Sequence, residues 1–283
     1  MKPSAKWGAV ALGVVVSVLA LMLVIVFLIS EALIVRRYTL PSSILQSSSK
    51  PEDLAWGRHV ATVFGCRDCH SFDLHGKLLY AQPGLIVAAP DLHGFSVRYT
   101  DADFDRAVRR GLAPDARALW VMPSQAYAYM RDTDLADIIG YARSLSGDPH
   151  NYPLPAFDFR ARLEVLAGTL AAVDPYDLGR FPPINAGPRY DGGRYLAAMA
   201  CSSCHATDLT GTDTAPDLKV VGRYSRTQFF ALMLRGTAPF GRQPEIMARL
   251  AQTRFHALKD YETDALYAYL VERAKTVNLN AAH

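Results

Sequence analysis

The chain has 283 residues, of which 50% are hydrophobic and 20% charged, values typical of a folded globular protein that exclude global disorder. Its formal net charge of only +3 does not support the broad basic surface that nucleic-acid proteins need, so we expect no nucleic-acid partner. This length has room for one or two domains.

The N-terminal segment is the most apolar part of the chain. Residues 8–29 carry no charge, and as a helix they would cover roughly 33 Å, enough for the hydrocarbon core of a bilayer. A cleaved secretory signal is the alternative, because Lys2 and Lys6 form a basic start and the small-residue sequence SEA follows at 30–32. Signal sequences usually have only about 7 to 15 apolar residues. We therefore interpret residues 1–37 as a transmembrane anchor.

The region after the anchor divides into a connecting segment and two halves. Residues 38–52 are rich in serine and include prolines, which predicts a stalk between the anchor and the folded body. We place one domain at 53–147 and a second at 188–283. Proline and glycine punctuate residues 148–187, which indicates a linker between the two domains.

The two halves repeat the same sequence features in the same order. GRHVATVFGCRDCH at 57–70 corresponds to GRYLAAMACSSCH at 193–205, and APDL occurs at 89–92 and again at 215–218. Such matches predict a tandem duplication.

Each half is expected to close with an amphipathic helix. In DTDLADIIGYARSL and YETDALYAYLVER, apolar residues recur at steps of three and four, the period of a packed helix. No sizeable β pattern is found anywhere in the chain. The sequence therefore predicts a mainly α fold with long loops.

All four cysteines lie in two Cys-x-x-Cys-His motifs. The first motif comprises Cys66, Cys69 and His70, and the second comprises Cys201, Cys204 and His205. Two thiols at this spacing can add across the two vinyl groups of a haem while the histidine binds the iron, and the spacing is that of c-type haem attachment. The sequence therefore predicts two covalently bound c-type haems.

Three other uses of the cysteine pairs are possible. A structural zinc site would have to pool both pairs around one ion and leave each histidine idle. A thioredoxin-like redox pair needs a βαβ context, which is missing here. Structural disulfides are conceivable in an exported protein. We favour haem over all three, because only haem attachment uses the cysteines and the histidine of both motifs.

The ligand on the other side of each iron distinguishes a carrier from an enzyme, because a methionine thioether closes the iron to exogenous ligands. In the first half we predict Met122 as this ligand. It precedes a proline, which restricts it to an extended conformation, and it lies before the closing helix. Met130, about two turns further on, is interpreted as a core residue.

In the second half we predict Met247, because it precedes the closing helix as Met122 does. Met199 lies just before the cysteines, on the histidine side, and Met233 lies in an apolar helical run. The remaining candidates for sixth ligands are three histidines that we interpret as surface or loop residues: His75, His93 and His256.

With these motifs the chain resembles membrane-anchored dihaem members of the class I cytochrome c family. The likeness spans residues 53–274 and is carried by the two haem motifs, by MPSQAYAYMRDTDLADIIGYARSL and by DALYAYL. The segment YTDADFDRAVRRGLAPDARALWVMPS is similar to the cytochrome subunits of bacterial membrane dehydrogenases for alcohols, aldehydes and sugar acids. Those subunits usually carry three haem motifs, whereas this chain has two.

The resemblance implies an N-terminal transmembrane helix followed by two tandem class I cytochrome c domains, with Met122 and Met247 at the axial positions. It also implies haem attachment by machinery outside the cytoplasmic membrane. Lys2 and Lys6 would then stay inside, and the chain would cross the inner membrane once and expose its domains to the periplasm.

We therefore expect an electron carrier rather than an enzyme. Its partners would be membrane lipid around the anchor and redox proteins, namely a dehydrogenase or other donor and a cytochrome or oxidase as acceptor. Two alternatives remain open: a dihaem peroxidase-like oxidoreductase with one open iron, and the dihaem subunit of a cbb3-type oxidase.

Overall fold

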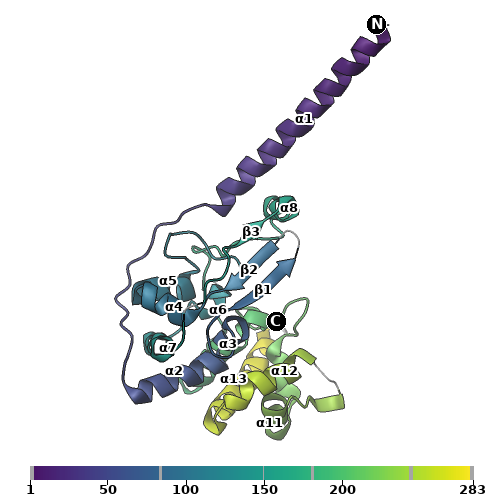
Figure 1. Ribbon diagram of the computed structural model, residues 1–283. Helices are drawn as coiled ribbons and strands as arrows, with labels where there is room; N and C mark the ends of the chain where they lie inside the picture. Colours follow the sequence, from purple (N-terminus) through teal and green to yellow (C-terminus); the bar gives the residue numbers. More distant parts are fainter. Residues whose placement is uncertain (1–2, 83–84, 149, 180–181, 242–244, 281–283) are drawn as a thin grey trace.

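The computed structural model of the protein describes residues 3–82, 85–148, 150–179, 182–241 and 245–280. The chain is mainly helical, as predicted. Figure 1 shows one long helix projecting from a folded body that contains both halves of the chain.

The projecting helix is α1 (Pro3–Ile34). Its segment Trp7–Ile34 has a mean hydropathy of 3.2 and is long and apolar enough to cross a membrane. None of its most apolar window is buried against the body. A signal sequence near the N-terminus would also meet this criterion of length and hydropathy. Lys2, one of the two charges expected on the inner side, lies outside the described residues.

The segment after α1, which its composition predicts to be a connecting stalk, makes contacts with the folded body. Residues 38–50 run without helix or strand along the first half. The Tyr38 amide donates to the Ala116 carbonyl at 2.9 Å, and the Ser47 amide donates to the Asp101 carboxylate at 2.7 Å. Serine and proline predict the lack of regular structure, but not that these backbone groups find partners on the body.

The helices of the first half are α2 (Pro51–Val63), α3 (Cys66–His70), α4 (Leu92–Arg98), α5 (Asp101–Arg110), α6 (Ser124–Tyr127) and α7 (Asp132–Ser144). Those of the second half are η1 (Pro188–Tyr190), α9 (Asp191–Ala200), α10 (Ser202–His205), η2 (Leu218–Arg223), α11 (Arg226–Arg235), η3 (Pro239–Gly241), α12 (Glu245–Thr253), η4 (Phe255–Ala257) and α13 (Asp260–Asn280). Helix α8 (Phe159–Ala167) lies in the linker.

Corresponding helices of the two halves begin and end in the same way. Helix α5 starts with a reciprocal capping box between Thr100 and Asp103, and α11 starts with one between Ser225 and Gln228. Both helices then end at a glycine in the left-handed conformation: Gly111 and Gly236. Helices α5 and α11 therefore share both their start and their end.

The predicted closing helices are α7 and α13. Helix α7 crosses α2, and α13 crosses α9, so each packs on the helix that leads into a cysteine motif. The contact is so close that only glycine fits. A Cβ at Gly57 would lie 2.0 Å from the Asp137 carbonyl oxygen, and a Cβ at Gly193 would lie 2.0 Å from that of Ala265. The same helix crossing is thus built twice.

A small antiparallel sheet interrupts the first half, which the sequence did not predict. Strands β1 (Lys77–Gln82), β2 (Leu85–Ala89) and β3 (Ala156–Phe157) lie in that order. The run over β1 and β2 is apolar without a clear alternation, and β3 is only two residues long, so neither gave a signal. Because β3 comes from the expected linker, the start of that linker packs with the first half.

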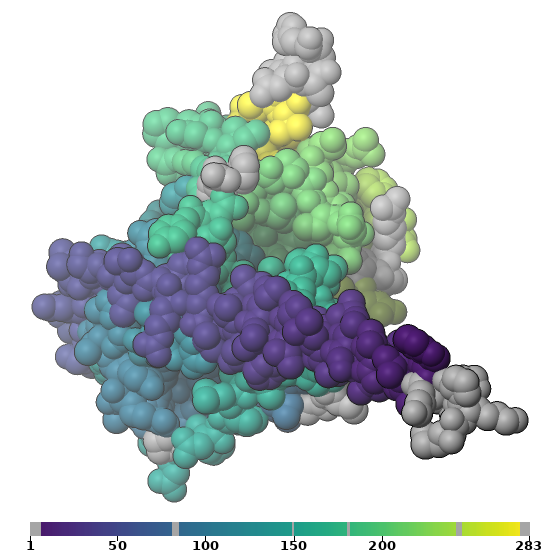
Figure 2. Space-filling model, turned by 90° about the horizontal axis from the view of Figure 1, so that it is seen from above, coloured from purple at the N-terminus to yellow at the C-terminus, as the bar shows by residue number. Residues whose placement is uncertain are grey.

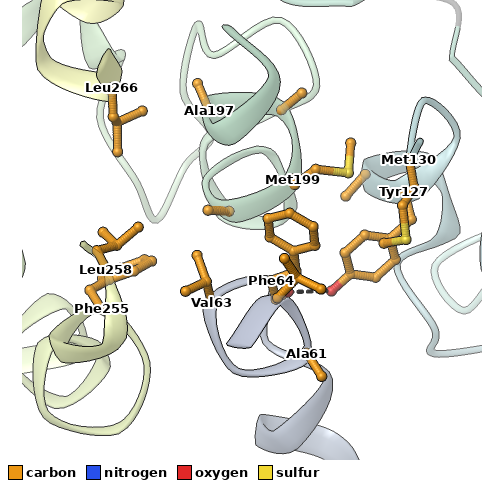
Figure 3. Close-up of a cluster of buried hydrophobic side chains, with 14 of the residues drawn as sticks. Ala61, Val63, Phe64, Tyr127, Met130, Ala197, Met199, Phe255, Leu258 and Leu266 are labelled. Carbon is orange, nitrogen blue, oxygen red and sulfur yellow. Dashed lines mark hydrogen bonds between the residues drawn. The ribbon is translucent and has the colours of Figure 1, made fainter. Parts of the chain in front are cut away.

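The two halves do not have separate cores. Buried residues of both belong to one continuous hydrophobic cluster, part of which is shown in Figure 3. The first half contributes Phe64, Tyr127 and Met130, and the second contributes Met199 and Phe255. Figure 2 accordingly shows the purple-to-teal first half and the green-to-yellow second half in direct contact.

Polar contacts across the interface between the two halves are reciprocal. His59 Nε2 lies 2.9 Å from the Glu262 carboxylate, while the Tyr195 hydroxyl donates to the Asp134 carboxylate. His59 and Tyr195 occupy matching positions in the repeat, each two residues after the crossing glycine. Asp134 and Glu262 also match, because each lies two residues after the start of its closing helix. Each half therefore gives the other the same kind of contact.

Replacing the crossing glycine tests this packing. Gly193→Ala should lower the free energy of unfolding by about 1–3 kcal/mol, because the added methyl group overpacks the contact with the Ala265 carbonyl. Gly192→Ala is the matched control. Nothing lies within 4 Å of its added Cβ, so the better helix propensity of alanine should raise stability by about 0.5–1 kcal/mol. Urea unfolding measures both variants, and equal effects would contradict the crossing.

Candidate functional site

The first Cys-x-x-Cys-His motif forms its own short helix, α3. Gly65 separates it from α2 with a left-handed backbone at φ 85°, a conformation that favours glycine. His70 is only 6% exposed. Its Nδ1 lies 2.8 Å from the Pro90 carbonyl oxygen.

The second motif repeats this geometry. Helix α10 follows α9, and His205 is 8% exposed with its Nδ1 at 2.7 Å from the Pro216 carbonyl oxygen. A carbonyl oxygen can only accept, so Nδ1 carries the proton in both histidines and the lone pair is on Nε2. This is the arrangement in which a second hydrogen bond orients a metal-binding imidazole.

A strained turn follows each histidine. Ser71 and Ala206, the next residues in the chain, adopt positive φ values of 67° and 65°, which are uncommon for residues other than glycine. Each turn is closed by a bond from a glycine amide to the histidine carbonyl at 2.9 Å, from Gly76 in one half and Gly211 in the other. Strain of this kind persists where the surrounding structure fixes it, and it clusters at functional sites.

The two APDL segments hold the proline carbonyls in place. Asp91 caps helix α4 by accepting from the Gly94 amide at 3.1 Å, and Asp217 accepts from the Lys219 amide at 2.8 Å. Asp217 also pairs at 2.8 Å with Arg273, which is fully buried. Although burial opposes it, these hydrogen bonds lower the pKa of the Asp217 carboxyl.

The surroundings of the first cysteine in each motif shift the pKa of its thiol. Burial raises the pKa of the Cys66 thiol to about 12, and burial likewise raises that of Cys201 to about 12. The surroundings of both thiols therefore favour the neutral form over the thiolate.

The four cysteines are free thiols, without a disulfide between them. Among the described residues, no group of three or more His, Cys, Asp or Glu side chains is arranged to hold a metal ion. In that part of the chain the zinc alternative therefore has no ligand set. The donor set present fits c-type haem instead: two free thiols and one histidine with its Nε2 lone pair available, in each motif.

Met122 lies in the loop before α6, as predicted, and is half-buried against the shared core. It lines an open cavity of about 350 Å³ between this loop and residues 171–174 of the linker.

Met247 is half-buried against the same core. It lies on helix α12, however, whereas Met122 lies in a loop. No proline follows Met247 to exclude the helical conformation. The two predicted sixth ligands thus share their place before a closing helix but not their backbone conformation.

The other methionines and histidines considered as sixth ligands have different contacts. Three methionines are buried in the shared core, as core residues would be: Met130, Met199 and Met233. His75 Nδ1 lies 3.4 Å from the Asp91 carboxylate, and His93 Nδ1 lies 3.2 Å from the Ala142 carbonyl oxygen.

The sequence gave no indication of Arg254. It lies between α12 and η4, is only 4% exposed, and donates from Nε to the Val63 carbonyl of the other half at 2.5 Å. A single arginine in a polar stretch normally indicates a solvated surface residue.

Comparison with protein families identifies the second half. Residues 190–274 match the family model described as Cytochrome c. This match supports a cytochrome c domain over this segment, and such a domain suggests a covalently bound c-type haem and a role in electron transfer. No curated protein matches the chain.

The segment that contacts His205 is held by the ion pair between Asp217 and Arg273, and this pair can be tested by substitution. Asp217→Ala would leave Arg273 buried without its carboxylate, which should cost about 3–5 kcal/mol of unfolding free energy. The control is Asp213→Ala, an exposed residue in the same loop, expected within about 0.5 kcal/mol of wild type. A loss no larger than that of the control, measured by urea unfolding, would show that the pair does not support the site.

Proposed function

We propose that the protein is a membrane-anchored periplasmic dihaem c-type cytochrome that passes single electrons from a dehydrogenase or other donor to a respiratory acceptor. The observation that carries this proposal is the repetition of one geometry. The first half lies outside the family match, yet it has the same histidine–carbonyl bond, strained turn and helix crossing as the matched half.

The residues that would hold the two haems are those of the motifs. Cys66 and Cys69 would form the thioether bonds in the first half, and Cys201 and Cys204 those in the second. A bound c-type haem supplies reversible one-electron exchange at its iron. The proline carbonyls fix the tautomer and the orientation of the two histidines, so that each Nε2 would be available to bind an iron.

The sixth ligands proposed are Met122 and Met247. A thioether on the open side of an iron raises its potential and excludes exogenous ligands. Both side chains lie at the edge of the shared core, where a bound haem would also bury apolar surface. This supports a closed electron carrier that binds no substrate.

Contacts at the base of α1 support a retained anchor over a cleaved signal. Arg162 on α8 pairs with Glu31 at 2.8 Å and donates to the Ser30 hydroxyl at 3.0 Å. Its guanidinium also lies 4.2 Å from the centroid of the Phe27 ring. Cleavage near residues 30–32 would remove partners that the folded body holds.

The helical position of Met247 is the observation that favours a second candidate. If this methionine did not reach the iron, the second haem would have an open position, as a dihaem peroxidase-like oxidoreductase requires. A dihaem subunit of a cbb3-type oxidase is a further possibility that differs only in its partners. Co-purification with copper-containing subunits would identify that role.

Spectra of the ferric protein distinguish a carrier from an enzyme. Met122→Ala and Met247→Ala should each remove about half of the methionine-to-iron absorption band and make one haem high-spin, because each removes one sixth ligand. Met233→Leu is the control, since Met233 is a buried core residue, and its spectrum should match wild type. A wild-type haem that is high-spin, binds cyanide rapidly and is unaffected by Met247→Ala would contradict the carrier and favour the enzyme.

A further inference from the structure

A buried arginine of the second half reaches into the first cysteine motif. The Nε of Arg254 donates to the Val63 carbonyl at 2.5 Å. Its guanidinium covers Gly65, the residue before Cys66, so closely that a Cβ at Gly65 would lie 2.8 Å from the Arg254 Cζ atom. The cation is therefore placed directly beside the point where the first haem would be attached.

The charge of Arg254 is only partly compensated. Its Nη1 lies 3.7 Å from the Asp68 carboxylate, whose side chain is 35% exposed. Its Nη2 is buried and has no hydrogen-bond partner among the described residues. A guanidinium cannot lose its proton in a protein. A full positive charge thus remains in a site of low dielectric, where its electrostatic effect is strong.

Both motifs are within reach of this one charge. Arg254 opposes the effect of burial on the pKa of the Cys66 thiol and also on that of Cys201. These are the first cysteines of the two halves. The geometry agrees with this: Figure 3 shows Phe64, two residues before Cys66, beside Met199, two residues before Cys201, and the ring centroids of Phe64 and Tyr195 lie 5.9 Å apart. The segments that lead into the two motifs thus meet in the shared core, next to the Val63 carbonyl that Arg254 contacts.

The charge also breaks the symmetry of the duplication. Arg254 lies six residues before the start of α13, and the residue six before the start of α7 is Ala126, which is buried. At this distance from its closing helix, the second half has a buried cation and the first half has a methyl group. The cation contacts the first motif directly, through Val63 and Gly65.

We propose that Arg254 is a positioning residue shared by the two haem sites: it fixes the first motif against the second half, and its charge raises the midpoint potentials of both haems, that of the first haem more. This inference rests on the proposed dihaem function. The physical reason is that a ferric haem carries one more positive charge than a ferrous haem, so a nearby cation favours the ferrous form.

The test is a spectroelectrochemical titration of the full-length holoprotein, with the haem-to-protein ratio measured on the same sample. In Arg254→Gln, both midpoint potentials should fall, by unequal amounts. We expect the ferrous-to-ferric ratio at a fixed potential to drop about threefold to tenfold for the more affected haem, where tenfold corresponds to 59 mV for one electron. Arg254→Lys keeps the charge and should retain potentials close to wild type.

His59→Ala is the control for a loosened interface. It removes the pair with Glu262 across the same interface but leaves Arg254 in place, so both potentials should stay at their wild-type values. Unchanged potentials in Arg254→Gln would overturn the inference, and so would an equal fall in His59→Ala. Wild-type protein with a single haem would instead overturn the proposed dihaem function, and the inference with it.

Arg254→Leu keeps the test decisive if Arg254→Gln does not fold, because an apolar side chain can fill the buried site without leaving an unpaired polar group. The potential of the more affected haem should fall as in Arg254→Gln. An unchanged or higher potential in Arg254→Leu would overturn the inference.

Discussion

One hydrogen bond in each half, from a histidine Nδ1 to a proline carbonyl, is the contact on which the site depends. It sets the tautomer of the imidazole and leaves Nε2 free for an iron. The surrounding structure keeps the donor and the acceptor in place. The strained turn holds the histidine carbonyl, and Asp91 and Asp217 anchor the segments that carry the prolines. In the proposed function, such a fixed frame would keep the ligand geometry constant while the charge on the iron changes.

The two halves act as one body. They share a hydrophobic core, and each accepts a polar contact from the other, through Glu262 in one direction and Asp134 in the other. For an electron carrier this has a clear consequence. Two haems attached to helices that pack into one core would keep a constant separation, so exchange between them would not depend on domain motion.

The sequence predicted the features that chemistry or periodicity fixes locally. The two motifs and the closing helices follow from spacing alone, and the structure contains α7 and α13 where they were expected. The sequence did not predict features that depend on tertiary contacts. The three-stranded sheet needs a partner from the linker, the segment 38–50 finds acceptors on the body, and the burial of Arg254 arises only when the halves meet. The helical conformation of Met247 is a further example, because its neighbours in the sequence do not determine whether it lies on a helix or in a loop.

The intact mass of the mature protein tests the central claim of two haems most directly. After maturation in a strain that attaches haem, the mass should exceed that of the polypeptide by two haems, and an alkylating reagent should modify none of the four cysteines. A mass increase of one haem, with Cys66 and Cys69 still open to alkylation, would contradict the account and restrict haem to the half that matches the cytochrome c family.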